Sequence, residues 1–544
     1  MATFEQFRNT FPEDSNEKGR DFEVFLCEWF LKEHPVYRSQ FKKIWHFTDW
    51  PERWHGSDIG TDLIAEDIHG KICAIQAKFY HPSHSIPTTE IDSFLSDSNR
   101  KIVDYRLLIG TTDYYSANAA NKIEGQEKPV QTFLLNEFLS WDIEWPESLV
   151  SLNDFSPPKP KTPREHQRLA INDVVENIDS RGQLIMACGT GKTFTTLWIK
   201  ERLKAKTVLV LLPSLSLLSQ TMREWVWGAS EPLEALAVCS DPTVGKSKNT
   251  DEDISTSEVG KVTSNVEEIK SFLRQIKSKV IFCTYQSSEL IQEGQKDENI
   301  EPFDLVVCDE AHRCAGKADA GFATILDENK IRARKRLFTT ATPRYFGKAV
   351  QSAAEGRGVE IIGMEDEEKF GPIVHQLTFG KAINYSPEPL LTDYQVVVVG
   401  VNEPMVRDWI AEGEIISAGE DHVTDARTLA AKIAVLKAIK DYKLERLISF
   451  HGNIKRAKDF SSDVFEVLEI VEKKNRPSGK IWSKHVDGTM SAGKRRELIN
   501  NLKTLKSHDI GLLTNARCLS EGVDVPSLDG VAFVDPRGSQ VDII

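Results

Sequence analysis

The chain has 544 residues, 40% of them hydrophobic and 28% charged, with a formal net charge of −14. This length suggests roughly three or four globular domains. No run of about 18 apolar residues occurs, which excludes a conventional membrane span, and the first residues lack a signal-peptide core, so we expect a cytoplasmic protein. The negative charge argues only weakly against a nucleic-acid partner, because binding depends on local patches.

The eight cysteines form no CxxC pair, so the usual spacing of a zinc site is absent. Several lie in apolar runs, as Cys308 does in DLVVCDEAH. We interpret them as reduced thiols packed in the protein interior.

Residues 1–150 are predicted to form a domain of mixed helix and strand. The apolar residues of Phe22–Leu31 have helical spacing. Asp62–Ala65 and Lys71–Phe79 are predicted as two strands around a tight turn, and Tyr105–Thr111 as a buried strand.

A proline-rich segment follows this domain. Ser156–Pro163 carries four prolines in eight residues, which can continue neither a helix nor a central strand. We therefore predict a linker over 151–163. Such a linker suits two parts that move as separate bodies.

Residues 164–385 and 386–544 each alternate short apolar strands with helices. The strands predicted in the first set are QLIMAC, TVLVLLPS, KVIFCTYQ, FDLVVCDE and KRLFTTAT. Those in the second set are YQVVVVGV, RLISFHG, KIWSKHVDG, IGLLTN and GVAFVDP. This alternation is typical of doubly wound parallel sheets covered by helices, so we predict an α/β protein with two such lobes.

The segment MACGTGKT (Met186–Thr193) lies between an apolar strand and a helix, which is the context of a phosphate-binding loop. The strict pattern begins with Gly where this chain has Met, but the GTGKT end is intact. Lys192 would contact the β- and γ-phosphates of ATP, and Thr193 would ligate Mg²⁺; the helix N-terminus adds a favourable dipole. The candidate nucleotide-binding residues of the loop are Gly189, Thr190, Gly191, Lys192 and Thr193.

A second motif, Asp309–Glu310–Ala311–His312, ends the apolar strand FDLVVC. An Asp at the carboxyl end of a strand can hold Mg²⁺, and the neighbouring Glu can orient or deprotonate the attacking water. We therefore predict Asp309 as a metal ligand and Glu310 as a catalytic residue.

The order of these segments resembles the superfamily 2 helicases and translocases, which implies RecA-like lobes. Further segments carry the resemblance. Arg164–Gln167 is similar to the family's adenine-reading segment, and Pro213–Gln220 and Thr284–Ser288 are similar to segments that contact the DNA backbone. Thr340–Thr342 resembles the segment that couples hydrolysis to movement, and Ile448–Phe460 and Thr514–Pro526 resemble two motifs of the second lobe. The resemblance adds Arg164, Gln167, Gly522 and Asp524 as nucleotide-binding residues. The family's last motif, with an arginine for the ATP transition state, would begin near Gln540, so we expect an incomplete second lobe and a truncated chain.

A separate constellation lies in Gly56–Tyr80. Gln76 and Lys78 are two residues apart and share one face of a strand. If Asp62 pairs with Gln76, all three side chains lie on that face, whereas a shift by one residue places Asp62 on the other. Asp62 and the Gln76 amide oxygen are suitable Mg²⁺ ligands, and Lys78 could steady the attacking water and the phosphate. Glu23 is a candidate additional carboxylate.

This constellation resembles the Mrr-like branch of the PD-(D/E)xK nucleases, in which Gln can replace the usual acid. Together with the motor motifs, it resembles the helicase-nuclease half of Type ISP restriction-modification enzymes; Phe370–Ile383 and Leu391–Val398 also resemble that group. The resemblance implies double-stranded DNA as partner, ATP and Mg²⁺ as cofactors, and methyltransferase and target-recognition domains in the missing C-terminal part. Two alternatives remain open: a stand-alone helicase-nuclease for phage defence or DNA repair, and a DNA-remodelling motor whose nuclease-like domain only grips DNA.

Overall fold

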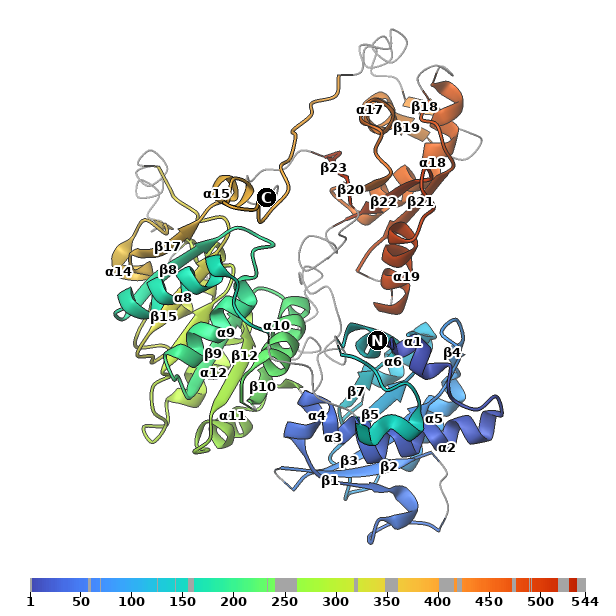
Figure 1. Ribbon diagram of the computed structural model, residues 1–544, viewed down its shortest axis with the longest axis vertical. Helices are drawn as coiled ribbons and strands as arrows, with labels where there is room; N and C mark the ends of the chain where they lie inside the picture. Colours follow the sequence, from blue (N-terminus) through green and yellow to red (C-terminus); the bar gives the residue numbers. More distant parts are fainter. Residues whose placement is uncertain are drawn as a thin grey trace. The chain divides into compact units, whose positions relative to one another are not determined.

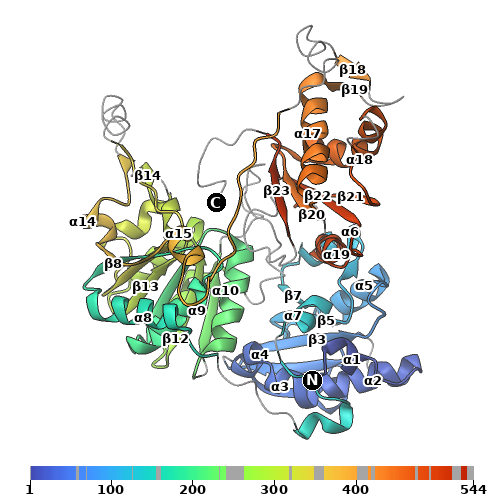
Figure 2. The same ribbon diagram turned by 45° about the horizontal axis from the view of Figure 1, so that its top comes forward.

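The structure is a computed structural model in which residues 1–392 and 393–544 form two compact units. The residues that it describes are 2–56, 60–68, 70–124, 126–141, 143–154, 161–231, 233–239, 262–317, 321–347, 361–400, 415–417, 423–471, 476–488, 490, 492–516 and 528–535. Figure 1 shows the elements, and Figure 2 shows the same ribbon turned by 45°. Each unit is described by itself below.

The first unit begins with a mixed five-stranded sheet in the order β1-β2-β3-β5-β7. Its strands are β1 (Phe41–His46), β2 (Leu63–Asp67), β3 (Ile72–Lys78), β5 (Tyr105–Gly110) and β7 (Val130–Phe133). β1, β2 and β3 are antiparallel, while β3, β5 and β7 are parallel. A short parallel pair, β4 (Ser85–Ile86) and β6 (Tyr114–Tyr115), lies apart from this sheet.

Helices cover both faces of this sheet (Figure 1). One face packs against α1 (Phe4–Arg8), α2 (Ser15–Phe25), the π-helical turn η1 (Leu26–Phe30), α3 (Leu31–Glu33), α4 (Pro35–Gln40) and α7 (Leu135–Ser140). The other face packs against α5 (Thr88–Asp97) and α6 (Ala117–Glu124). Because strand side chains alternate, Leu63 and Ile75 point to the first face, whereas Ile64 and Ala74 point to the second.

A parallel eight-stranded sheet forms the second part of this unit, in the order β11-β10-β12-β9-β13-β15-β8-β17. Its strands are β8 (Arg181–Met186), β9 (Thr207–Leu212), β10 (Glu234–Val238), β11 (Val262–Thr263), β12 (Lys279–Thr284), β13 (Leu305–Cys308), β15 (Arg336–Thr340) and β17 (Ile373–Leu377). β8, β12, β13 and β15 are buried along their whole length, and β9 is buried except at its first residue, as continuous apolar runs predict.

Helices cover both faces of the parallel sheet. α8 (Glu165–Asn177), α9 (Lys192–Arg202) and α10 (Leu215–Gly228) pack on one face, and α11 (Val266–Leu273) and α12 (Ser288–Gln295) pack on the other. The smaller elements are α14 (Glu367–Phe370), α15 (Phe379–Ile383) and the antiparallel pair β14 (Gly316–Lys317) and β16 (Ile361–Ile362). The predicted doubly wound first lobe is confirmed.

The second unit contains a parallel four-stranded sheet in the order β21-β22-β20-β23. Its strands are β20 (Arg446–Phe450), β21 (Ile481–Val486), β22 (Ile510–Asn515) and β23 (Gly530–Phe533). α17 (Ala426–Tyr442) and α18 (Ile454–Ile470) pack on one face and α19 (Ala492–Lys503) on the other. A two-stranded pair, β18 (Ile415–Ser417) and β19 (Val423–Asp425), precedes α17.

One predicted strand of the second lobe is wrong. The described part of YQVVVVGV, residues 394–400, forms no strand, and the side chains of Tyr394, Val396 and Val398 are 69%, 79% and 94% exposed. A β-branched run forms a strand only when it pairs with a neighbouring strand, and these residues have no such neighbour in the described structure.

Among the helices that the structure describes, none has both the length and the apolar character needed to span a membrane.

Candidate functional site

The phosphate loop connects β8 to α9, as the sequence predicts. Gly189 and Gly191 have φ angles of +79° and +82°, a left-handed conformation that strongly favours glycine. Thr190 tightens the loop, because its hydroxyl donates to the carbonyl of Ala187 at 2.6 Å. The loop amides therefore precede a helix N-terminus, which is a favourable site for phosphate.

The predicted adenine-reading segment lies directly against this loop. The Gln167 side-chain amide donates to the carbonyls of Thr190 (3.4 Å) and Gly191 (3.3 Å), and its Oε1 accepts from the backbone N–H of Arg164 at 2.9 Å. A Cβ atom at Gly191 would collide with Gln167 Nε2. The structure thus brings Gln167 against the loop, and Arg164 is hydrogen-bonded to Gln167.

Asp309 and Glu310 follow β13 and face the phosphate loop. Lys192 Nζ lies 3.5 Å from Glu310 Oε1. Burial and the neighbouring Glu310 carboxylate raise the pKa of Asp309. Burial alone would raise the pKa of Glu310 as well, but the hydrogen bond from His312 and the charge of Lys192 hold it below its usual range. Glu310 is therefore the more acidic carboxyl of this pair.

The strand β15 lies between β13 and β8 and connects the two motifs. Thr339 Oγ1 donates to Asp309 Oδ1 at 2.7 Å, and Thr340 Oγ1 donates to Glu310 Oε2 at 3.3 Å. His312 Nδ1 lies 3.0 Å from Thr340 Oγ1. The predicted coupling segment Thr340–Thr342 therefore contacts the acidic motif directly, and Thr339 is a contact that sequence reasoning missed.

The predicted nucleotide-binding residues of the second lobe, Gly522 and Asp524, lie outside the described residues. Thr193 lies in the first turn of α9, and its carbonyl accepts from Trp225 Nε1 at 3.1 Å. Thr193 is therefore placed at the loop, while its role as a Mg²⁺ ligand stays a prediction.

The register of the β2–β3 hairpin places the three predicted nuclease residues, Asp62, Gln76 and Lys78, on one face of the sheet. Leu63 lies opposite Ile75 and Ile64 opposite Ala74, so Asp62 falls opposite Gln76. Asp62, Gln76 and Lys78 consequently share the face that α5 covers. The register on which the nuclease prediction depended is the one found in the structure.

Gln76 offers an amide oxygen for a metal ion beside the Asp62 carboxylate. Asp62 Oδ2 accepts from the backbone N–H of Ala77 at 2.5 Å, and Gln76 Nε2 donates to the carbonyl of Gly60 at 3.1 Å. In the described structure, Gln76 Oε1 is buried and has no hydrogen-bond partner. A buried amide oxygen without a partner is costly unless it gains one. Mg²⁺, which prefers oxygen ligands, fits this donor set.

Lys78 has a partner that the sequence did not reveal. Its Nζ lies 3.2 Å from Glu90 Oε2 on α5, and Glu90 Oε1 accepts from the hydroxyl of Tyr80 at 2.5 Å. Glu23, by contrast, belongs to α2, which packs on the opposite face of the sheet. Glu90 is thus an additional carboxylate near Lys78, and the role of Glu23 stays a prediction.

A buried carboxylate supports the segment that leads into the hairpin. Asp97 accepts hydrogen bonds from Trp54 (2.9 Å) and Thr61 (2.8 Å), and its Oδ1 lies 2.8 Å from His55 Nε2. Burial alone would raise the pKa of Asp97, but these hydrogen bonds outweigh it and lower the pKa. Asp97 therefore fixes Thr61, the residue before Asp62.

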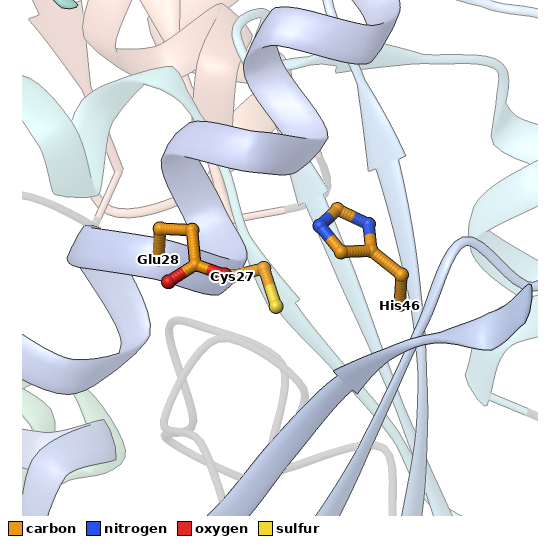
Figure 3. Close-up of side chains that lie close together, drawn as sticks. All are labelled: Cys27, Glu28 and His46. Carbon is orange, nitrogen blue, oxygen red and sulfur yellow. The ribbon is translucent and has the colours of Figure 1, made fainter. Parts of the chain in front are cut away.

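Three further potential ligands gather at η1 and β1, apart from both sites. The ligand atoms of Cys27, Glu28 and His46 lie within 4.8 Å of one another (Figure 3). Burial and the charge of Glu28 raise the pKa of Cys27 to about 11, and Glu28 is engaged by Lys32 Nζ at 2.9 Å. Cys27 is therefore a protonated, packed thiol beside a surface ion pair.

Comparison with known families divides the chain into the two parts described above. Residues 32–154 match a family described as restriction endonuclease, and residues 160–345 match a family described as Type III restriction enzyme, res subunit. These matches confirm an N-terminal nuclease domain followed by a RecA-like helicase fold.

Individual proteins resemble longer stretches of the chain. The ATP-dependent Type ISP restriction-modification enzyme LlaBIII bound to DNA is 29% identical, with a TM-score of 0.79, over 100% of this chain and 36% of that chain. A nuclease-deletion mutant of the Type ISP enzyme LlaGI is 32% identical over 41% of this chain and 20% of that chain, with a TM-score of 0.32. The probable helicase A859L of African swine fever virus is 26% identical over 388 residues, or 70% of this chain and 38% of the viral protein. The resemblance to Type ISP enzymes is confirmed, and the chain spans little more than a third of LlaBIII and of the viral helicase.

Proposed function

We propose that this chain is an ATP-dependent double-stranded DNA translocase coupled to a Mg²⁺-dependent DNA endonuclease. One observation carries the proposal: a single chain holds both a phosphate loop facing an acidic motif and a strand hairpin with Asp62, Gln76 and Lys78 on one face. The resemblance to LlaBIII supports a role as the motor and nuclease part of a restriction-modification enzyme.

In the motor, the phosphate loop would hold the phosphates of ATP, with Lys192 at the β- and γ-phosphates. Thr193 and Asp309 would hold the Mg²⁺ that accompanies ATP. Glu310 is ionised and would orient the attacking water. Arg164 and Gln167 would read the adenine, and Gly522 and Asp524 would complete the site from the second lobe.

In the nuclease, Asp62 and Gln76 would hold Mg²⁺, which when bound supplies charge stabilisation at the scissile phosphate. Lys78 would stabilise the developing negative charge, and Glu90 would position Lys78 through their ion pair. Glu23 remains a candidate carboxylate. The hairpin supplies no base-reading element that we identify, so we propose that the motor determines where cleavage occurs.

DNA would be bound through its backbone. The segments Pro213–Gln220 and Thr284–Ser288 follow β9 and β12, at the sheet edge that also carries the phosphate loop. Their hydroxyl and amide side chains suit phosphate and sugar contacts, so affinity should fall steeply with salt and depend little on sequence. We propose that methyltransferase and target-recognition domains act together with this chain.

The test is DNA cleavage measured with and without ATP and Mg²⁺ in the complete enzyme. We expect Lys192→Ala to lower ATP hydrolysis, and with it cleavage, by about 10²–10³-fold, and Asp62→Asn to abolish cleavage alone. If Asp62→Asn and Lys78→Ala both still cut DNA, the nuclease site lies elsewhere. If neither the wild type nor these variants cut DNA while ATP hydrolysis persists, the chain is a remodelling motor.

A further inference from the structure

The N-terminal domain and the first RecA-like lobe contact each other through a helix from each. α4 of the nuclease domain lies against α10 of the lobe. Val36 packs against the core of the lobe, and Trp227 of α10 packs against the core of the nuclease domain. Each part therefore inserts an apolar side chain into the edge of the other.

His34 lies at the centre of this contact. Its ring meets that of Trp227 edge to face, with centroids 6.0 Å apart, and His34 is only 2% exposed. In the described structure, neither ring nitrogen of His34 nor Trp227 Nε1 has a hydrogen-bond partner. Burying polar atoms without hydrogen-bond partners costs free energy, so the packing of the two rings and of Val36 must outweigh this cost. The contact of His34, Val36 and Trp227 is here called the seam.

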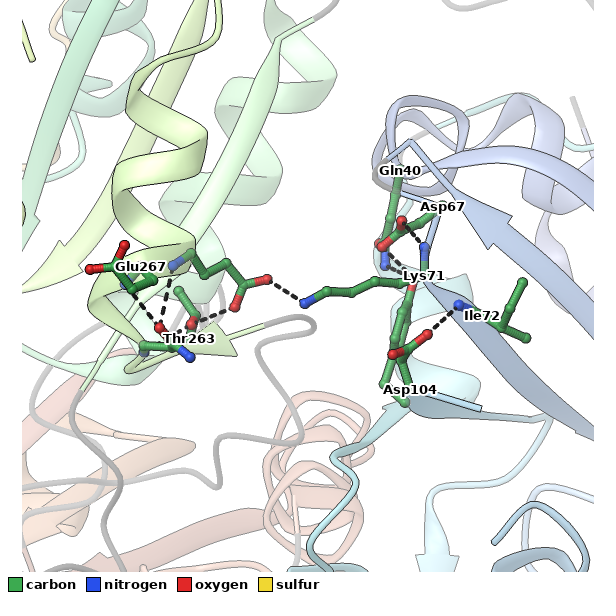
Figure 4. A network of polar contacts seen from close by, with 10 residues as sticks. Gln40, Asp67, Lys71, Ile72, Asp104, Thr263 and Glu267 are labelled. Carbon is green, nitrogen blue, oxygen red and sulfur yellow. Dashed lines mark hydrogen bonds and ion pairs between the residues drawn. The ribbon is translucent and has the colours of Figure 1, made fainter. Parts of the chain in front are cut away.

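An ion pair connects the β2–β3 hairpin of the nuclease domain to the first RecA-like lobe (Figure 4). Lys71 Nζ lies 3.0 Å from Glu268 Oε1 on α11, and Glu268 Oε2 accepts from Thr263 Oγ1 at 2.7 Å. Lys71 belongs to the turn between β2 and β3, where its backbone N–H donates to Asp67 Oδ1 at 2.9 Å. Lys71 thus links the lobe to the turn between the two strands that position the proposed nuclease site.

We propose that the nuclease domain and the first lobe move as one body, docked through the seam and oriented by the Lys71–Glu268 pair. The sequence suggested instead a nuclease carried on a linker as a separate body, whereas residues 1–392 form one compact unit. The lobe thereby fixes where the hairpin faces relative to the ATP site. This last consequence rests on the proposed function, while the docking itself does not.

The test is amide hydrogen exchange in the complete protein. In Trp227→Ala, exchange of the backbone amides in residues 34–40 and 215–228 should rise roughly tenfold or more, since removing a large packed side chain opens the seam. Trp45→Ala is the matched control, because Trp45 is also half-buried but packs on the other face of the nuclease sheet. Its exchange in those two segments should match the wild type. Equal exchange in Trp227→Ala and wild type would overturn the proposal.

The charge pair provides a second test that does not endanger folding. Lys71→Glu should raise the exchange of hairpin amides 62–78 by about two- to fivefold, because partly exposed ion pairs contribute little. Adding Glu268→Lys should restore the wild-type rate, which a purely local effect of either substitution would not do. Absence of rescue would refute the role of the pair. Exchange is measured without cleavage, so failure of the proposed nuclease activity leaves both tests intact.

Discussion

Lys192 and Glu310 face each other across the phosphate loop, with Nζ 3.5 Å from Oε1. Both side chains are largely buried. Burial alone would lower the pKa of Lys192, but the negative charge of Glu310 and of the groups around it outweighs burial and raises this pKa. The phosphates of ATP would therefore compete with Glu310 for Lys192. Nucleotide binding would release the Glu310 carboxylate to the attacking water.

Lys192→Ala should lower the rate of DNA-stimulated ATP hydrolysis by about 10²–10³-fold, since it removes one electrostatic contact to the transferred phosphoryl group. Phosphate release by the complete enzyme measures this rate. Lys296→Ala, which alters an exposed lysine on the same lobe, should hydrolyse ATP at the wild-type rate. An unchanged rate in Lys192→Ala would contradict the assignment.

Glu310→Gln should separate ATP binding from hydrolysis. The rate should fall by about 10²–10⁴-fold, the usual contribution of a general base. Affinity for ATP should stay equal or increase, because the amide no longer competes with the phosphates for Lys192. Binding is measured with a fluorescent ATP analogue. Loss of affinity in this variant would show that Glu310 holds nucleotide rather than water.

Gln76 provides a specific test of the nuclease site. Gln76→Glu should retain Mg²⁺-dependent cleavage, because a carboxylate oxygen can replace the amide oxygen as a metal ligand. Gln76→Leu should abolish cleavage while ATP hydrolysis persists, since leucine offers no ligand atom. Both variants are assayed for nicking and for phosphate release. Cleavage by Gln76→Leu at the wild-type rate would remove Gln76 from the site.

Because His34 is buried, we expect the free energy of unfolding to depend on pH. Burial and the nearby Arg223, the charged group facing it from α10, lower the pKa of His34 from 6.5 to about 3. The unfolded chain therefore binds a proton below pH 6.5 that the folded chain does not. The contribution of neutral His34 to the free energy of unfolding is complete above pH 6.5. This contribution is lost as the pH falls from 6.5 towards 3, by up to about 1.4 kcal/mol per pH unit.

This loss should depend on His34 itself. Urea unfolding at about pH 7.5 and about pH 5.5 should show a smaller loss of stability in His34→Phe than in the wild type. His81→Phe, which changes an exposed histidine, should behave as the wild type does. An identical pH dependence in His34→Phe and wild type would count against a neutral, buried His34.

Local sequence pattern was sufficient for much of the fold and of both sites. Apolar runs such as Thr207–Leu212 identified the parallel strands, and glycines at fixed spacing identified the phosphate loop. The alternation of side chains along β3 placed Gln76 and Lys78 on one face. These features depend on residues that are close together in the sequence.

Features that depend on distant residues could not be predicted. Glu90 meets Lys78 from a helix that follows the hairpin, and Asp97 meets Trp54 across 43 positions. The strand predicted at 394–400 failed for the same reason, because its formation requires a neighbour that its own residues do not specify. The seam joins α4 and α10, which lie nearly two hundred residues apart in the sequence and carry no shared pattern.

Gln167 lies so close to Gly191 that its proposed role in reading adenine and the proposed phosphate binding of the loop would depend on each other. Any side chain at position 191 would displace the Gln167 amide, and it would also strain a backbone with a φ angle of +82°. Substitutions at the two positions will therefore not have additive effects. A variant library that samples both positions together should yield active pairs only where position 191 is glycine. If Gln167 reads the base as proposed, nucleotide preference should change with substitutions at Gln167 and not with substitutions in the loop that it touches.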